Sequence, residues 1–496
     1  MNRHAHCAWL LGLCLLLGGC ALIREEGSLA PQRDPAELRL ADDLHLAREG
    51  WPESSWWRRY EDPQLNQLIE MAFAQAPGIA IARSHIDQAR AQADTVKSLT
   101  GVQVQLIALV NRQHVSANGF LGPFAQNEPA LGLTGPWYTE GVVGLGGAYQ
   151  LDLWGRQRAQ VDAALGVHNA RQAEEAWVEL EVSSNVAMLY FQIQTAQQLL
   201  DDLQHMSAIT AEVVAAHQAR IERGLESQPL KQQALSNQAL IDRQVVSLRS
   251  QVWQLREAMR ALLGVGADVT LPLAPRTLPE HVYGVPDSLG YELLARRPDL
   301  QALRWLVQAS YSNIDAAKAA FYPSFDIKAF YGADALHMGD LWAHGSRQVN
   351  LIPGLTLPIF DGGRLNAELA TARSLSNGLV YQYNQAVLDA VRDVAVAGSK
   401  QQGLETQEQL QQSRIGNMRF NRDSATAHYQ RGLLDRVTAL ESNLPLLAEH
   451  SGLALLQGQR LESEIALIKA LGGGYHSSNT VAALPATSID YVDSHH

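Results

Sequence analysis

The feature that most constrains the fold of this chain is a pattern of residues that occurs twice. Three pairs of matching positions each lie 208 residues apart: Arg156 and Arg364, Gly224 and Gly432, Gly264 and Gly472. Pro77 and Pro298 lie 221 residues apart, so the first copy has a longer loop after its proline. Self-similarity at a fixed period indicates a tandem duplication. We predict structural repeats over 64–265 and 287–472, joined by a proline-rich linker over 266–286.

Each half contains two segments in which apolar side chains alternate with small or polar ones. In the clearest of them the odd positions, such as Val143 and Leu145, are apolar, and the even positions are small or polar. A period of two is typical of a β-strand with one apolar face. The predicted strands are 102–112, 143–153, 324–333 and 349–359.

These four strands suit a sheet that lies in a membrane. The chain after Cys20 contains no apolar run of about 18 residues, so none of its helices is expected to cross a bilayer. Four strands cannot close a barrel, because single-chain barrels begin at eight strands and open edges are not tolerated in lipid. We therefore expect an oligomer, and three copies would form a twelve-strand β-barrel.

The remainder of each half has the spacing of coiled-coil helices. In 182–203 and in 241–262 apolar residues recur in steps of four and three, which implies helix pairing with left-handed supercoiling. The segment from Gly155 to Gly224 would form roughly 100 Å of helix. Two shorter predicted helices, 64–99 and 229–264, together match that length. The alternative, an ordinary long helical bundle, does not account for the strands.

The N-terminus has the layout of a secretory leader, with a basic Arg3, an apolar run over 8–17 and the sequence Leu-Gly-Gly-Cys ending at Cys20. This ending resembles the lipobox of bacterial lipoproteins. It implies a signal peptide over 1–19, a covalent lipid on Cys20 and a lipidated N-terminal extension over 20–63. The alternative, a plain signal peptide, would leave an unpaired thiol in an oxidising compartment. By the same resemblance, Ala21 favours sorting to the outer membrane.

Composition and motifs exclude several classes of function. A formal net charge of −12 and the lack of a dense basic tract argue against binding of nucleic acid. The sequence has no Gly-x-Ser-x-Gly, His-Glu-x-x-His or P-loop motif, so we expect no enzyme activity, no metal and no cofactor besides the lipid. All three cysteines lie within the first twenty residues, which excludes disulfides from the mature chain. Any energy for transport must come from a partner.

Five separate segments together resemble the TolC-like outer membrane factor family, in its lipoprotein branch of OprM- and NodT-type efflux proteins. The resemblance rests on the lipobox, on the Trp-Trp-Arg-Arg-Tyr-Glu-Asp-Pro-Gln-Leu sequence over 56–65, and on the segments over 295–300, 321–324 and 358–364. With the helix-end glycines it extends from residue 17 to about residue 472, which is nearly the whole mature chain.

The resemblance implies an α+β membrane protein, a homotrimer whose twelve-strand barrel lies in the outer membrane and continues into a long periplasmic α-helical coiled-coil barrel. It implies an exit duct that passes small toxic compounds or drugs from the periplasm. Its partners would be a periplasmic adaptor (membrane fusion) protein, an inner-membrane efflux pump and outer-membrane lipid. Whether the pump is proton-driven, of the facilitator type or ATP-driven stays open.

The resemblance also places the closed end of the duct at Gly224 and Gly432, which break the long helices. Residues that follow or precede these breaks are the candidates for the gate: Glu226, Tyr429, Arg431, Asp435 and Glu441. Around a threefold axis each acid would form a ring that repels itself and attracts cations. Closure would then rest on Tyr429 and Arg431. The alternative is that Glu226 and Asp435 are solvated acids at a helix turn.

Two other functions are compatible with parts of this sequence. A non-conducting, lipid-anchored trimeric stalk or adhesin would need the helices but not the strands, and an exit duct for type I protein secretion would need both. The loop over 113–140, rich in Gly and Pro, is expected to be extracellular because it joins two strands. A C-terminal tail follows over 473–496.

Overall fold

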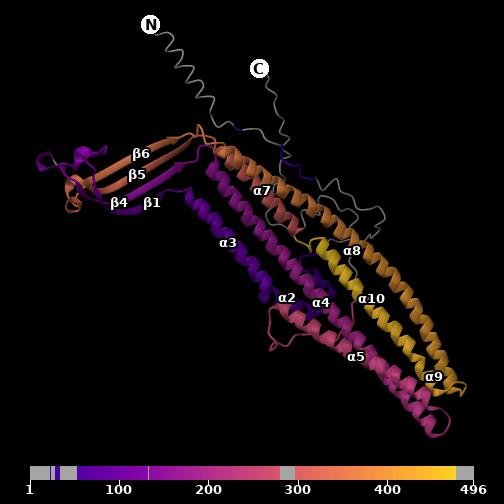
Figure 1. The fold of residues 1–496 in the computed structure, drawn as a ribbon. Coiled ribbons are helices and arrows are strands. Elements are labelled where there is room, and N and C mark those ends of the chain that lie inside the picture. The colour runs from indigo at the N-terminus through magenta and orange to yellow at the C-terminus, as the bar shows by residue number, and fades with distance from the viewer. Residues whose placement is uncertain (1–22, 24–27, 34–52, 132, 280–296, 476–496) are drawn as a thin grey trace, which may run out of the picture. The chain divides into compact units, whose positions relative to one another are not determined.

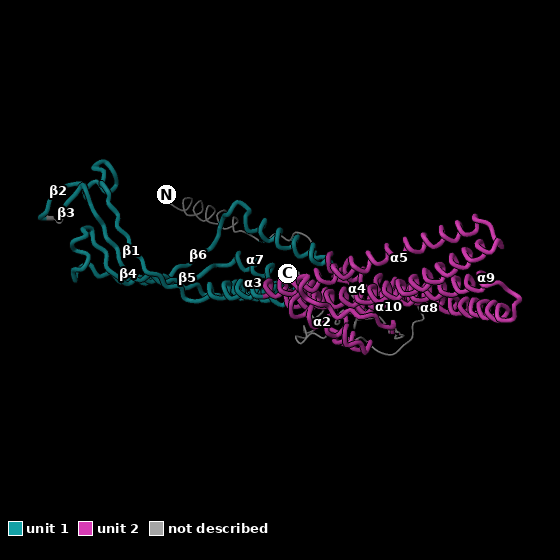
Figure 2. Tube along the Cα trace, turned by 90° about the horizontal axis from the view of Figure 1, so that it is seen from below, with its two compact units in different colours: residues 1–31, 87–169, 304–381 teal, residues 32–86, 170–303, 382–496 magenta. Residues whose placement is uncertain are grey.

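The computed structural model describes residue 23 and residues 28–33, 53–131, 133–279 and 297–475 (Figure 1). The predicted leader, Cys20, most of the N-terminal extension, part of the linker and the tail beyond 475 lie outside these residues. The chain divides into two compact units, 1–31 with 87–169 and 304–381, and 32–86 with 170–303 and 382–496 (Figure 2). The first unit contains the strands, and the second contains the ends of the long helices.

The principal sheet is antiparallel, with the order β1-β4-β5-β6. Its strands are β1 (Gln103–His114), β4 (Trp137–Leu151), β5 (Ser324–Ala335) and β6 (Arg347–Thr356). Each half therefore contributes two adjacent strands, as predicted, and β1 and β6 are the two edges. The ends differ, since β4 begins six residues earlier and β6 ends three residues earlier than the alternation indicates.

The register aligns the apolar face across all four strands. Leu106 pairs with Leu145, Leu145 with Tyr331, and Tyr331 with Val349. One position along, the aligned residues of the other face are Gln105, Gly146, Phe330 and Asn350. Side chains alternate between the two faces of a strand. A shift of one residue in any strand would therefore move its apolar side chains to the other face of the sheet. One face of the sheet is thus apolar and the other largely polar.

Loops at one end of the sheet carry structure that the sequence did not indicate. The β1–β4 connection contains a short hairpin of β2 (Asn127–Glu128) and β3 (Leu133–Thr134). The 3-10 turn η3 (Gly122–Ala125) precedes this hairpin, and η4 (Pro129–Leu131) connects its two strands. The β5–β6 connection contains η5 (Met338–Asp340) and η6 (His344–Ser346). The two loops meet where Nε2 of His337 lies 2.6 Å from Oγ1 of Thr134.

Each half contains one long helix, as predicted. α4 (Arg156–Glu222) and α8 (Arg364–Gln430) are both 67 residues long, which corresponds to roughly 100 Å. The return helices are α5 (Gln228–Leu263) in the first half, and α9 (Arg436–Glu441) with α10 (Asn443–Ala470) in the second. α7 (Pro298–Ala319) precedes the second pair of strands. No helix within the described residues combines the length and apolarity needed to cross a membrane.

The prediction of one helix over 64–99 was wrong. The segment forms two helices, α2 (Pro63–Gln75) and α3 (Pro77–Leu99), separated by Ala76 in an extended conformation. Pro77 lacks the backbone N–H of a helix interior and disfavours helical geometry at the residue before it. The break was therefore readable from the Ala-Pro pair.

The largest core belongs to the second unit and buries η2 (Trp56–Tyr60) with α2 against α4, α5 and α10. Its fully buried side chains include Trp56, Leu65, Tyr190, Phe191 and Ile465. Asp62 caps α2 by accepting the backbone N–H of Gln64 at 2.8 Å, and its other oxygen accepts the hydroxyl of Tyr190 at 2.5 Å. Burial, together with this carboxylate, raises the pKa of Tyr190. The Trp-Trp segment is thus an integral part of the fold.

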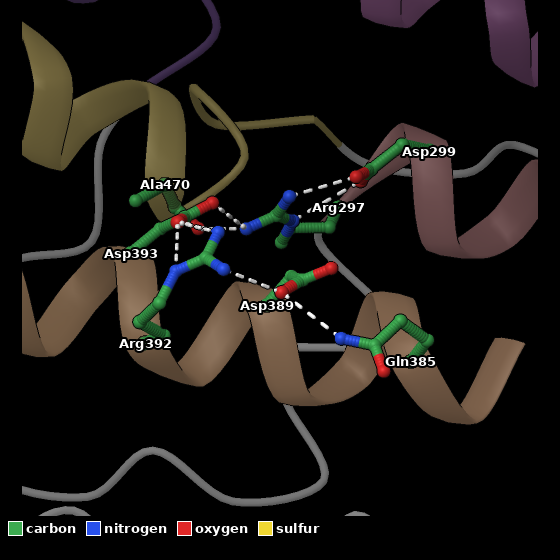
Figure 3. Close-up of polar contacts among 7 residues, drawn as sticks. All are labelled: Arg297, Asp299, Gln385, Asp389, Arg392, Asp393 and Ala470. Atoms are coloured by element: carbon green, nitrogen blue, oxygen red, sulfur yellow. Dashed lines mark hydrogen bonds and ion pairs between the residues drawn. The ribbon is translucent and has the colours of Figure 1, made fainter. Parts of the chain in front are cut away.

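Arg297 connects three elements of the same unit (Figure 3). Its guanidinium pairs with Asp299 at the start of α7 at 2.7 Å, lies 3.9 Å from Asp393 of α8, and donates to the carbonyl of Ala470 at the end of α10 at 3.3 Å. It also lies 5.4 Å from the ring centre of Trp177. A cation at a helix C-terminus satisfies carbonyls that have no helical partner.

Candidate gate at the helix tips

Both long helices end at a glycine in the left-handed conformation. Gly224 has φ of 71° and Gly432 has φ of 72°. In each turn the following residue donates its N–H back into the helix, from Leu225 to Arg220 at 2.9 Å and from Leu433 to His428 at 2.9 Å. An added Cβ would meet nothing within 4 Å at either glycine. The requirement for glycine is therefore conformational rather than steric.

Glu226 follows the first turn and is almost completely buried. Its carboxylate lies 2.8 Å from Nδ1 of His217 and 3.5 Å from Nε of Arg220. The side chains of Glu226 and His217 are 6% and 9% exposed. Both contacts run from the loop back to the last turns of α4, so they hold the turn against the helix that it terminates.

Asp435 follows the second turn and is the N-cap of α9. Its Oδ1 accepts the backbone N–H groups of Val437 and Thr438 at 2.9 and 3.2 Å, and its Oδ2 accepts the Thr438 hydroxyl at 2.7 Å. The hydroxyl of Thr438, followed by the backbone donors and the charge of Arg220, lowers the pKa of Asp435. Asp435 is therefore an ionised cap.

Arg220 joins the two turns. While its Nε faces Glu226, its Nη1 lies 3.4 Å from Oδ1 of Asp435, which belongs to the other half of the chain. A second ion pair, between the more exposed side chains of Arg436 and Glu212, has a distance of 3.5 Å. Apolar contacts of Val213, Ala234 and Val437 lie beneath these pairs. The two tips are thus held together by one small apolar cluster and two ion pairs.

The other predicted gate residues lie near this cluster but are not part of it. Tyr429, Arg431 and Glu441 are exposed, and among the described residues none of their side chains has a hydrogen bond or ion pair. The structure brings Glu226 and Asp435 together through Arg220. It leaves Tyr429, Arg431 and Glu441 exposed on the surface of the single chain. Their predicted roles at a threefold axis stay predictions.

Sequence reasoning missed His217 and Arg220. A basic residue in the last turn of a helix is common, since it interacts favourably with the helix dipole, so Arg220 carried no distinguishing signal. Its partner Asp435 lies 215 positions away in the sequence. Only the folded arrangement of the two repeats relates them. No group of three His, Cys, Asp or Glu side chains suited to a metal ion occurs in the described part of the chain.

A family model described as "Outer membrane efflux protein" matches residues 68–265 and 289–473, once for each repeat. The chain belongs to the outer membrane efflux protein family. The members of this family are transporters, so the chain is a transporter rather than an enzyme, and it is an outer-membrane efflux channel.

Named relatives are similar over almost their whole length. The "Multidrug resistance outer membrane protein MdtP" of Escherichia coli K12 is 46% identical over 472 residues, which cover 95% of this chain and 97% of the relative. MdtQ of Escherichia coli O157:H7 is 40% identical over 470 residues, covering 93% and 97%.

Solved structures have the same fold. The channel CmeC of Campylobacter jejuni superposes with a TM-score of 0.81 at 19% identity, covering 91% of this chain and 96% of that chain. The outer membrane protein VceC of Vibrio cholerae gives a TM-score of 0.74 at 26% identity, covering 86% and 100%. The expected TolC-like fold, with four strands per chain and long helices in two repeats, is confirmed.

Proposed function

We propose that this chain is the exit duct of a tripartite multidrug efflux system, and that it acts as a homotrimer. The observation that carries the proposal is the register of the sheet, which gives one apolar and one largely polar face and leaves β1 and β6 as edges. Edges in lipid require partners. Pairing of β6 with β1 of the next copy satisfies them, and closure by three copies turns the polar face toward an aqueous lumen.

Small toxic compounds are the proposed cargo. Two relatives with at least 40% identity are named multidrug resistance outer membrane proteins, which supports drugs rather than proteins as the substrate. The chain has no motif for energy conversion, so an inner-membrane pump and a periplasmic adaptor would supply substrate and energy. A protein-secretion duct and a non-conducting stalk are the competing functions.

Attachment to the membrane is proposed to involve two elements, the sheet and a lipid on Cys20. The Leu-Gly-Gly-Cys sequence supports both the lipid and membership of the lipoprotein branch. Mass spectrometry of the mature N-terminus tests this point, and an unmodified Cys20 would exclude the lipoprotein assignment. The Cys20→Ala variant is expected to reach the membrane still, because the sheet itself would hold it there.

The helix tips are proposed to form the periplasmic gate. Glu226 is buried and paired, which supports a role in holding the closed turn rather than in lining a pore. Asp435 and Glu441 are the acids available to a lumen. We expect Arg220 to stabilise the closed state, because it alone contacts acids of both turns within the described residues.

Conductance across a planar bilayer tests the proposed duct. The full-length protein should form channels that are mostly closed, and a deletion strain should become sensitive to several structurally unrelated drugs. The absence of any conductance from the wild type and from the Arg220→Ala variant would favour the stalk. Loss of protein secretion without drug sensitivity would favour the type I duct.

A further inference from the structure

The junction between strand and long helix is built in the same way in both halves of the first unit. Before α4, the carboxylate of Asp152 accepts the N–H groups of Gln157 and Arg158 at 3.1 and 2.9 Å. Before α8, Asp361 accepts those of Gly363 and Leu365 at 3.0 and 2.8 Å. These backbone donors, Leu365 first, lower the pKa of Asp361. Both acids are therefore engaged in starting a helix.

Beside each cap the chain presents an exposed apolar pair and an arginine. The pairs are Leu153 with Trp154, and Ile359 with Phe360, of which Phe360 is 87% exposed. Arg156 and Arg364 are the first residues of the two helices. Water-exposed apolar side chains of this size, repeated at equivalent places, indicate contact with another apolar phase.

The two arginines line one cavity of about 220 Å³. Its walls also include Trp154, Tyr322 and Ser324, so both halves of the chain contribute. The Trp154 and Tyr322 rings are stacked with centres 5.0 Å apart, and the Trp154 indole N–H donates to the Pro323 carbonyl at 2.8 Å. This contact fixes the aromatic wall of the cavity.

The cavity presents two guanidinium groups. Of the carboxylates near them, Asp152 and Asp361 accept backbone N–H groups, and Asp361 also interacts with the charge of Arg364. Within the described residues, the Arg156 side chain has no hydrogen bond or ion pair. Arg364 pairs with Glu368 at 2.7 Å, but both side chains are more than half exposed, and such pairs are weak and easily exchanged. The oxygens of Asp152, which also line the cavity, are already engaged by backbone N–H groups. A ligand with several anionic oxygens would complement these guanidinium groups.

We propose that this cavity binds the phosphate of a phospholipid in the inner leaflet of the outer membrane. A phospholipid fits better than a free anion because its acyl chains would cover the exposed apolar pairs next to the arginines. Aromatic side chains are enriched where a membrane protein leaves the hydrocarbon and enters the headgroups, and the ends of β4 and β6 are such a place. The inference rests on the outer-membrane location and on the proposed orientation of the sheet.

Native mass spectrometry of the full-length protein with phosphatidylglycerol tests the inference. The Arg156→Ala/Arg364→Ala variant should bind this lipid at least tenfold more weakly than the parent. Arg158→Ala is the matched control, because Arg158 is exposed on the first turn of α4 but does not line the cavity. The Arg156→Lys/Arg364→Lys variant should retain part of the binding, since it keeps the charge and loses the planar fork.

Two further measurements separate this site from the duct. Inorganic phosphate should not displace the lipid, whereas displacement at millimolar concentration would mean that the cavity selects a free anion. Channel conductance and ion selectivity should be unchanged in the double-alanine variant. Unchanged conductance would also show that this variant is folded. Unchanged lipid binding with a shift toward cation selectivity would overturn the inference, because the arginines would then line the lumen.

Discussion

Arg220 and Asp435 form an ion pair of 3.4 Å although they lie in different repeats of the chain. The same guanidinium reaches Glu226 at 3.5 Å, so one side chain contacts the acids that follow both helix breaks. A duct that opens by separating its tips must break such contacts.

Arg220→Ala should raise basal conductance in a planar bilayer. The pair with Asp435 is partly exposed, so its own contribution is small, about 1 kcal/mol or less, and we expect a severalfold rise in open probability rather than a permanently open channel. Arg223→Ala is the control, since Arg223 is exposed one turn later and has no side-chain partner among the described residues. Equal effects of the two variants would place the closing contact elsewhere.

Glu226→Ala should loosen the first turn. The change leaves Nδ1 of the buried His217 without its acceptor, at a cost of roughly 1–3 kcal/mol, and it also removes one of the two acids that face the partly exposed Arg220. Hydrogen exchange of the backbone over 220–228 should therefore become faster. Glu222→Ala, which removes only an exposed contact with Gln218, should leave the exchange unchanged. Slow exchange in both variants would show that the glycine turn alone holds the tip.

Thr438→Val should weaken the second turn at neutral pH and make its stability less dependent on pH. The Thr438 hydroxyl is the main cause of the lowered pKa of Asp435, so its removal moves that pKa back toward the ordinary value of 3.8. A pKa that is lowered in the folded state stabilises that state at any pH above the ordinary pKa. This stabilisation is lost as the pH falls through the pKa of the folded state. Limited proteolysis over 431–442 should therefore be faster in the variant at neutral pH, and its difference from the parent should shrink as the pH falls below 3.8. Thr426→Val, which removes a bond within α8, should behave like the parent.

The acids and the polar pair at the second tip should have separate effects on the channel. Replacing Asp435 and Glu441 with alanine should lower the preference for cations in single-channel recordings, because carboxylates near a threefold axis attract cations. Because this change also removes the Asp435 partner of Arg220, it should raise basal conductance as Arg220→Ala does. Replacing Tyr429 and Arg431 should raise basal conductance without changing selectivity. Parental behaviour of both double variants would mean that the constriction lies away from Gly432.

Gly264→Ala should destabilise the protein more than Gly432→Ala. Both glycines have φ of 72°, so both substitutions incur the strain of a left-handed residue, roughly 1–2 kcal/mol. At Gly264 an added Cβ would also lie 2.8 Å from Cδ of Pro77 and 2.9 Å from the Gln75 carbonyl, whereas the space at Gly432 is open. Thermal unfolding of the two variants measures the difference. Equal losses would show that the contact with Pro77 relaxes freely.

The sequence predicted the elements well where a repeated period or a glycine marks them. The helix ends at Gly224 and Gly432 and the alternation around Leu145 were both readable, because backbone conformation and burial impose them locally. The break before Pro77 was also readable and was overlooked. The distant partners of Arg220 and Arg297 could not be predicted from the sequence. Each arginine contacts an acid more than 90 positions away, which only the tertiary fold brings close.

β1 and β6 are the two edges of the sheet, and in the proposed trimer the backbone hydrogen bonds on these outer sides would come from the neighbouring chains. In the proposed trimer, one chain with a defective edge spoils the pairing of both others. Co-expression of equal amounts of sound and edge-defective chains would then leave only about one-eighth of the assemblies intact if the chains mix at random. A mutation in β1 or β6 should therefore be dominant over the normal gene, whereas most mutations elsewhere in the chain should be recessive.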